Sequence, residues 1–130
     1  MSIRAYRVQG RNNMLGAFYT STGQQESITG DQSYLSVELY HSKIYTIDSS
    51  ITLKLSNGIQ DGQLKCVTFV HQGVLDANIT LDVPGLLGTD TQVDFINLGD
   101  TLLLMWDGKA WTVLYTLNTI DPSYQTPIVT

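Results

Sequence analysis

Few residues of this chain have the type and spacing that catalysis needs. Its two histidines, His41 and His71, lie far apart beside turn residues, and its single cysteine, Cys66, belongs to no CxxC or Cys/His pattern. The chain also lacks a GxSxG elbow, a phosphate-binding loop and an HExxH zinc motif. We therefore expect no enzymatic activity and no catalytic residue. Cys66 is interpreted as a small buried hydrophobic residue in a reducing compartment.

Asp90, Asp94 and Asp100 are the strongest candidates for metal ligands, because the three carboxylates fall within eleven residues. Their spacing lacks the alternating acidic residues and the glycine of an EF-hand loop. Asp94 also lies between the apolar residues Val93 and Phe95, so strand alternation places it toward solvent. The sequence therefore predicts no metal site, and nothing in it predicts another cofactor.

Aromatic residues form a second candidate site, a surface for sugars. Trp106, Trp111 and Tyr115 lie close to Asp107 in the sequence, and large aromatic faces with a few polar groups suit shallow glycan sites. These three aromatic residues are the candidate glycan contacts. The alternative is that at least one tryptophan packs in the core, which its position within an apolar strand favours.

The elements that must position these residues are strands. Apolar residues make up 42% of the 130 residues and charged residues only 15%, and no stretch shows a helical apolar stripe. We expect a single all-β domain, an antiparallel β-sandwich of jelly-roll-like type with about eight strands. The expected strands are Tyr34–Tyr40, Lys43–Ile47, Ser50–Ser56, Gln63–His71, Ala77–Val83, Gln92–Asn97, Thr101–Trp106 and Ala110–Leu117.

The last two of these strands form a hairpin with two apolar faces. The loop is either Asp107-Gly108, which pairs Trp106 with Lys109, or Gly108-Lys109, which pairs Trp106 with Trp111. Both registers place Leu102, Leu104 and Trp106 on the side of Trp111, Val113 and Tyr115. The opposite side then carries Leu103, Met105, Ala110, Thr112 and Leu114. Either another subunit covers this side, with Leu103, Met105 and Leu114 in the interface, or the N-terminal arm or a loop covers it.

The two ends of the chain differ from this body, which we place at residues 33–117. Residues 1–32 are broken by glycines but contain apolar residues, and all three arginines precede the first acid, Glu26. We expect an extended arm that docks on a surface; the alternative is an edge strand over Leu15–Thr20. Residues 118–130 are expected to form an extended tail outside the sheets or crossing to a neighbour. The expected docking residues of the arm are Arg4, Tyr6, Arg7, Arg11, Phe18 and Tyr19.

Charge and hydropathy also bear on the partners. Residues 26–130 carry four lysines against twelve acids, and such an acidic body argues against nucleic acid as a partner. No apolar run is long enough for a signal peptide or a membrane span, so we expect neither.

Two runs of the chain resemble a β-module of virion structural proteins. They are NGIQDGQLK, from Asn57 to Lys65, and GDTLLLMWDGKAW, from Gly99 to Trp111, with Ile79–Leu81 and Phe95 between them. Such modules occur in capsid decorations, spikes and fibres of tailed phages and large DNA viruses, and the likeness covers about residues 56–116. The resemblance implies a non-enzymatic, trimeric assembly protein whose motif residues are fold signatures.

Physical reasoning and resemblance favour the same class of function. We expect a bacteriophage or viral decoration (cement) protein, made in the host cytoplasm, that forms a homotrimer on the outer capsid surface of the virion. Its partner there is the major capsid protein, with no membrane or nucleic acid partner. One alternative is a tail-fibre or spike module that binds host surface glycans. Another is a small enzyme or lectin domain unrelated to viruses.

Overall fold

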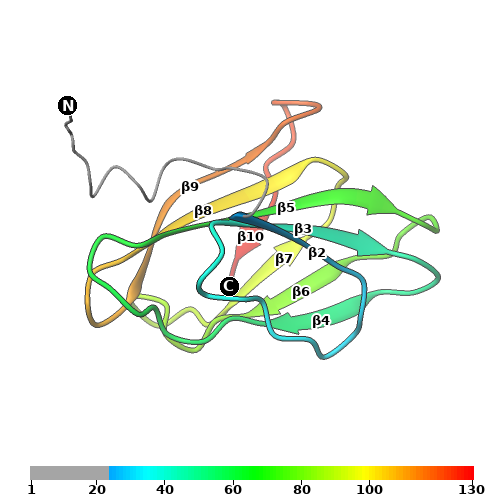
Figure 1. The fold of residues 1–130 in the computed structure, drawn as a ribbon. Helices are drawn as coiled ribbons and strands as arrows, with labels where there is room; N and C mark the ends of the chain where they lie inside the picture. The colour runs from blue at the N-terminus through cyan, green and yellow to red at the C-terminus, as the bar shows by residue number, and fades with distance from the viewer. Residues whose placement is uncertain (1–23) are drawn as a thin grey trace, which may run out of the picture.

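The structure is a computed structural model that describes residues 24–130. These residues form nine β-strands and no α-helix, which confirms the predicted all-β class (Figure 1). No helix among them is long and apolar enough to cross a membrane. The strands are β2 (Gln25–Ile28), β3 (His41–Thr46), β4 (Ile51–Lys54), β5 (Leu64–Gln72), β6 (Ile79–Asp82), β7 (Gln92–Phe95), β8 (Asp100–Trp106), β9 (Trp111–Asn118) and β10 (Ile128–Val129).

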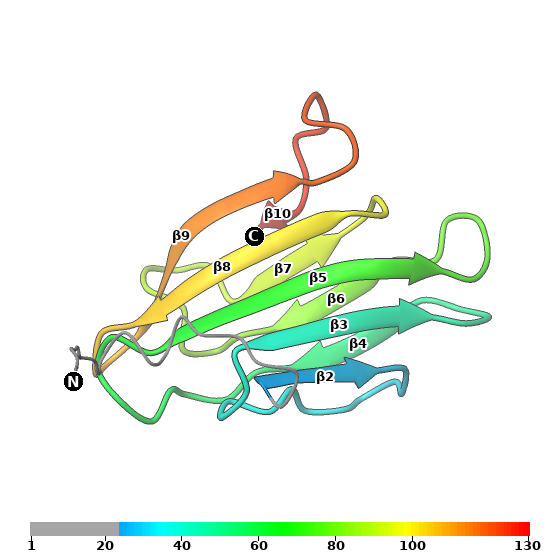
Figure 2. The same ribbon diagram turned by 45° about the horizontal axis from the view of Figure 1, so that its top comes forward.

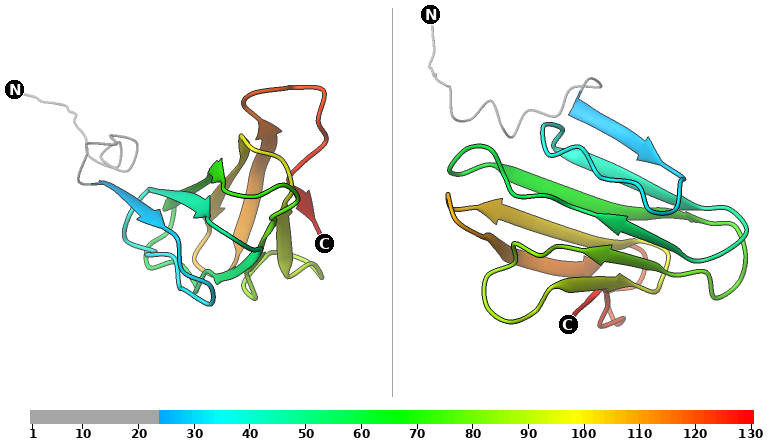
Figure 3. Two further views of the ribbon diagram at one scale, coloured as in Figure 1. Left: turned by 90° about the vertical axis from the view of Figure 1, so that its right-hand side faces the viewer. Right: turned by 90° about the horizontal axis from the view of Figure 1, so that it is seen from below.

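The strands form two stacked sheets (Figures 2 and 3). One has the order β2-β3-β5-β8-β9 and the other has the order β10-β7-β6-β4. Both are mixed, because β2–β3, β3–β5 and β4–β6 are parallel pairs. The prediction of antiparallel, jelly-roll-like sheets is wrong for these three pairs. Between β3 and β5 the chain forms β4 in the other sheet, and between β4 and β6 it forms β5 in the other sheet. The second strand of each pair therefore starts at the same end of its sheet as the first, as parallel pairing requires.

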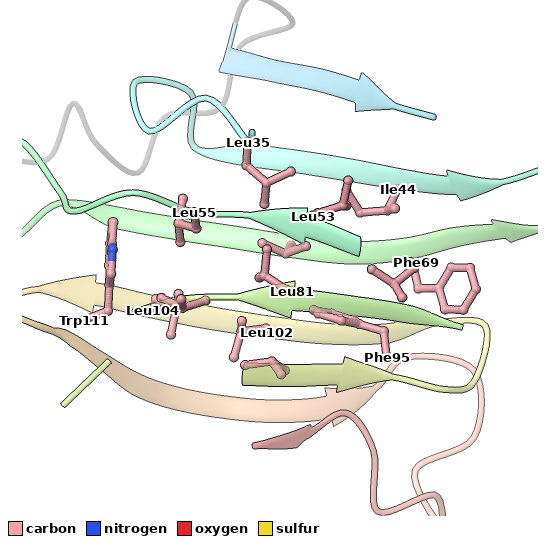
Figure 4. Close-up of a cluster of buried hydrophobic side chains, with 14 of the residues drawn as sticks. Leu35, Ile44, Leu53, Leu55, Phe69, Leu81, Phe95, Leu102, Leu104 and Trp111 are labelled. Carbon is pink, nitrogen blue, oxygen red and sulfur yellow. The ribbon is translucent and has the colours of Figure 1, made fainter. Parts of the chain in front are cut away.

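The core lies between the two sheets (Figure 4). The predicted alternation is confirmed where it is cleanest, because Ile51, Leu53 and Leu55 are buried and the residues between them are not. Trp106 and Trp111 meet edge to face in this core, with ring centroids 5.4 Å apart. The other buried apolar residues of the core are Leu35, Ile44, Val67, Phe69, Ile79, Leu81, Val83, Leu86, Val93, Phe95, Leu102 and Leu104.

The β8–β9 hairpin takes the second of the two predicted registers. Trp106 pairs with Trp111, and Gly108 has the positive φ of 96° that the first loop residue of a type II′ turn requires. Asp107 Oδ1 closes the turn by accepting hydrogen bonds from the backbone N–H groups of Lys109 and Ala110, both at 2.8 Å.

A β-bulge in this hairpin overturns part of the predicted face assignment. Leu104 pairs with Val113, but Leu103 pairs with Tyr115, so Leu114 has no partner on β8. The extra residue reverses the side-chain alternation beyond it, and Tyr115 therefore shares the outer face of the sheet with Leu103. The prediction that Tyr115 faces the same side as Trp111 is wrong for this reason.

The segment expected to be the strand Tyr34–Tyr40 is a loop with one bridge, between Tyr34 and Lys54. Its pattern did predict burial, since Leu35 lies in the core and Val37 packs against it. Two strands were not expected: β2 lies in the stretch assigned to the arm, and β10 lies in the tail. The tail therefore rejoins a sheet, contrary to the prediction that it stays outside. The expected docking residues Arg4, Tyr6, Arg7, Arg11, Phe18 and Tyr19, and the alternative strand Leu15–Thr20, lie outside the described residues.

Gly58 gives a direct test of how the tryptophans are packed. A Cβ at this position would overlap the side chain of Trp106, so Gly58→Ala should lower the free energy of unfolding by about 1–3 kcal/mol. Chemical denaturation followed by tryptophan fluorescence measures the change. Ile59→Ala is the matched control, because Ile59 is adjacent and exposed. Equal stability of Gly58→Ala and the wild-type protein would contradict this packing.

Candidate functional site

Lys65 is a charged side chain that lies wholly inside the protein, with none of its surface exposed. It points inward from β5 and pairs across the sheet with Leu104. Its Nζ donates hydrogen bonds to Ser36 O at 2.6 Å, to Leu39 O at 2.8 Å and to Ser42 Oγ at 2.7 Å. The ammonium therefore has acceptors in the loop before β3 and on β3 itself.

Glu26 on β2 completes this network. Its Oε2 lies 3.6 Å from Lys65 Nζ and accepts hydrogen bonds from Ser36 N at 2.8 Å and from Ser42 Oγ at 2.6 Å. The Gln63 side chain adds a bond to Val37 O. Side chains thus satisfy backbone groups of residues 36–39, which explains why this segment is a loop and not the predicted strand.

The chemistry open to Lys65 is limited by its enclosure. Burial lowers its pKa from 10.5 to about 8, although Glu26 acts in the opposite direction. A lysine with such a pKa can act as a nucleophile or base only if a substrate reaches it. Because Lys65 has no exposed surface, we assign it to holding β2, the 36–39 loop, β3 and β5 together.

Asp100 is a second buried charged residue, and it fastens the start of the tail. Its Oδ2 accepts bonds from the backbone N–H groups of Ile96 and Asn97, at 2.8 and 2.9 Å. Its Oδ1 accepts bonds from Asn118 Nδ2 at 2.7 Å and from Thr126 Oγ1 at 2.6 Å. The carboxylate oxygens are thus occupied by protein donors. Between residues 24 and 130, no three His, Cys, Asp or Glu side chains are grouped so that they could hold a metal ion.

The structure brings Cys66 and His41 together, which the sequence did not suggest. They are neighbours on β5 and β3, and Thr68 Oγ1 lies 3.0 Å from His41 Nε2 and 3.9 Å from Cys66 Sγ. Burial raises the pKa of the Cys66 thiol, and burial together with Lys43 and Lys65 lowers the pKa of His41. Both groups are therefore neutral at neutral pH, and a protonated thiol is a poor nucleophile. The parallel β3–β5 pairing that creates this contact has no signal in the sequence.

The three candidate glycan contacts do not form one site. Trp106 and Trp111 are buried in the core, and Trp111 Nε1 donates a hydrogen bond of 2.9 Å to Ser56 O. Tyr115 is 42% exposed, on the opposite face of the sheet. The alternative interpretation, that a tryptophan packs in the core, is confirmed for both.

The three residues predicted for a subunit interface lie on or beside the outer face of β8 and β9. Leu103 and Met105 are half-buried there, and Leu114, the bulge residue, is exposed. Tyr115 and Leu117 are exposed as well. We call Leu103, Met105, Leu114, Tyr115 and Leu117 the β9 patch. Among residues 24–130, β9 is the last strand of its sheet, and it contains no charged residue. Beyond Trp111, the patch therefore borders an uncharged edge with which no described strand pairs.

Sequence reasoning missed the buried roles of Glu26, Lys65 and Asp100, although it considered Asp100 as a metal ligand. Lys65 did carry a signal, since it interrupts the apolar run from Leu64 to Val70, where a charge must find buried partners. Glu26 and Asp100 carried none, because their partners come from segments that are distant in the sequence.

Replacing Lys65 tests the buried network. Lys65→Met removes the ammonium and leaves Ser36 O and Leu39 O without their donor, so we expect a loss of roughly 3–5 kcal/mol in the free energy of unfolding. Denaturant titration measures the loss. Lys109→Met, at the exposed hairpin turn, is the control and should change stability little. A small effect of Lys65→Met would show that the network does not hold the loop.

The pH dependence of stability gives an independent test. The unfolded chain binds more protons at Lys65 than the folded chain between pH 8 and 10.5, so the contribution of Lys65 to stability rises with pH over this range. Below about pH 8 its contribution is constant. Tyr40 and Cys66, whose pKa values burial raises, act in the opposite direction but are present in both proteins. The free energy of unfolding of the wild type minus that of Lys65→Met should therefore grow from about pH 7.5 to 9.5. A constant difference would contradict the lowered pKa.

No protein-family model matches the chain, and no curated protein sequence matches it. The resemblance to virion β-modules stays a prediction.

Proposed function

We propose that the protein is a capsid decoration (cement) protein, a homotrimer that binds the outer surface of the major capsid shell and stabilises it. The observation that supports this proposal best is the β9 patch. Within residues 24–130, the large apolar side chains of Leu114, Tyr115 and Leu117 are exposed beside a sheet edge with which no described strand pairs. Contact with another chain would bury them and add the free energy of that burial to the stability of the subunit.

In this proposal, the N-terminal segment has a defined point of attachment to the body. β2 begins at Gln25, and the buried network of Glu26 and Lys65 fixes it to the body. The predicted arm, residues 1–32, thus contains a firmly held strand, and the proposed docking residues Arg4 to Tyr19 precede this strand. We also propose that the fold is a variant of the β-sandwich of virion modules, in which three strand pairs are parallel instead of antiparallel.

The alternative function, a tail-fibre or spike module that binds host glycans, gains no support from the site. Sugar stacking needs exposed aromatic faces, and the structure leaves only Tyr115 of the three candidates at the surface. An enzyme or lectin domain gains no support from the described residues either. Assembly therefore remains the function that the geometry favours.

The proposal predicts a compact trimer that rebinds particles stripped of it. Sedimentation velocity measures the oligomer, and co-sedimentation with stripped particles measures rebinding. Leu114→Asp should raise the dissociation constant of the trimer by at least about tenfold, because it brings an unpaired charge into the interface. Deletion of residues 1–23 should abolish rebinding but preserve the trimer, because β2 remains.

Leu75→Asp is the matched control, since Leu75 is 88% exposed on the loop between β5 and β6, away from β9. It should leave both assembly and rebinding unchanged. A stable monomer that does not bind stripped particles would overturn the proposed function.

A further inference from the structure

The edges of the two sheets are protected to very different degrees. The edge strand β4 is covered by residues 32–35 through backbone bonds such as Leu35 N to Lys54 O, 2.8 Å, and Lys54 N to Ser33 O, 3.0 Å. The edge strand β10 has only two residues. Proteins commonly protect sheet edges by such covering or shortness, or by charged residues and prolines, because free strand edges pair with other chains.

β9 shows little of this protection. It is eight residues long and contains neither a charged residue nor a proline. Among residues 24–130, its free side is covered only at Trp111, which bonds to Gly85 O and Leu87 N. The bulge at Leu114 bends the strand but leaves Leu114, Tyr115 and Leu117 exposed. Because each chain carries a net charge of −5, copies should approach one another most easily through such uncharged segments.

The symmetry of the trimer, on which this inference rests, excludes edge-to-edge pairing of two β9 strands, because β8 already occupies the other edge of each β9. A cyclic trimer repeats one contact between two different surfaces of the subunit. β9 must therefore meet another part of the next copy. The remaining edge is β2, at the opposite side of the same sheet, where the charge of Glu26 is already taken up by Lys65 and Ser42.

Strand direction also fits this pairing. β2 and β3 run parallel to β5, while β8 is antiparallel to β5 and β9 is antiparallel to β8, so β9 runs in the same direction as β2. Rotation about an axis along the strands preserves that direction in the next copy. Ser27 and Leu117 lie at the two ends of one row of paired residues across the outer face of the sheet. The row is Ser27, Lys43, Thr68, Thr101 and Leu117.

We propose that β9 of each copy pairs in parallel with β2 of the next copy, so that three five-stranded sheets join head to tail around the trimer axis. The partner of the β9 edge is thus β2 of a second copy, the strand that follows the arm, and Leu117 of the β9 patch lies beside that strand. Formation of the trimer would therefore also hold β2, the strand that follows each arm, in place.

Cysteine cross-linking tests this contact. In a Cys66→Ala background, the Ser27→Cys/Leu117→Cys double variant is treated with a short bis-maleimide. We expect most of the protein to run as a covalent trimer on a denaturing gel. A mixture of the two single variants should give covalent dimers only, because each copy then has one cysteine. Leu75→Cys/Leu117→Cys is the control for reach and should not link.

The outcomes separate this contact from the proposed function. Dimers of Leu117→Cys alone would show contact between β9 strands and overturn the head-to-tail pairing. A trimer that rebinds particles but does not link through residues 27 and 117 would also overturn the pairing, while the proposed function would stand. Covalent trimers that fail to rebind particles would support the pairing and overturn the capsid assignment. A monomer would overturn both.

Discussion

An ammonium group that has lost its water must be surrounded by acceptors from the protein, and the position of Lys65 imposes this requirement on a large part of the fold. Two of its acceptors are backbone carbonyls, Ser36 O and Leu39 O. In this structure both carbonyls bond to the ammonium instead of to a neighbouring strand. The segment between β2 and β3 therefore crosses back as a loop, and the two strands run parallel. The same ammonium keeps Glu26 inside, which removes a charge from the edge strand.

The sequence predicted well what depends on neighbouring residues along the chain. The alternation of Ile51, Leu53 and Leu55 identified a strand and its buried face, and seven of the eight expected ranges overlap an observed strand. The Asp107–Ala110 turn was reduced to two registers, of which one is observed. The parallel pairs were not predictable, because nothing in a strand's composition shows that the chain visits the other sheet before returning. β10 was missed because two residues paired with β7 have no pattern of their own.

The candidate site shows the same division. Leu103 and Met105 were correctly separated from the core, since alternation along β8 is unbroken. Tyr115 was misplaced, because a single unpaired residue, Leu114, changes the parity of every residue after it. The burial of the two tryptophans explains one of the two apolar faces of the hairpin, because that face belongs to the core of the subunit itself. What remains exposed is smaller and lies along β9, which narrows the surface through which copies can meet.

The two ends of the described chain differ in how they would respond to tension. A pull on Gln24 along the axis of β2 would have to slide four residue pairs past β3 at once, with the Glu26 contacts opposing the same movement. A pull on the last residue acts on β10, which has two residue pairs with β7, and on the backbone bonds that join Thr130 to Thr91 and Gln92. The N-terminal attachment is thus a shear joint and the stronger of the two. Under load the C-terminal strand should detach first, while the sheet that carries the N-terminal strand stays intact.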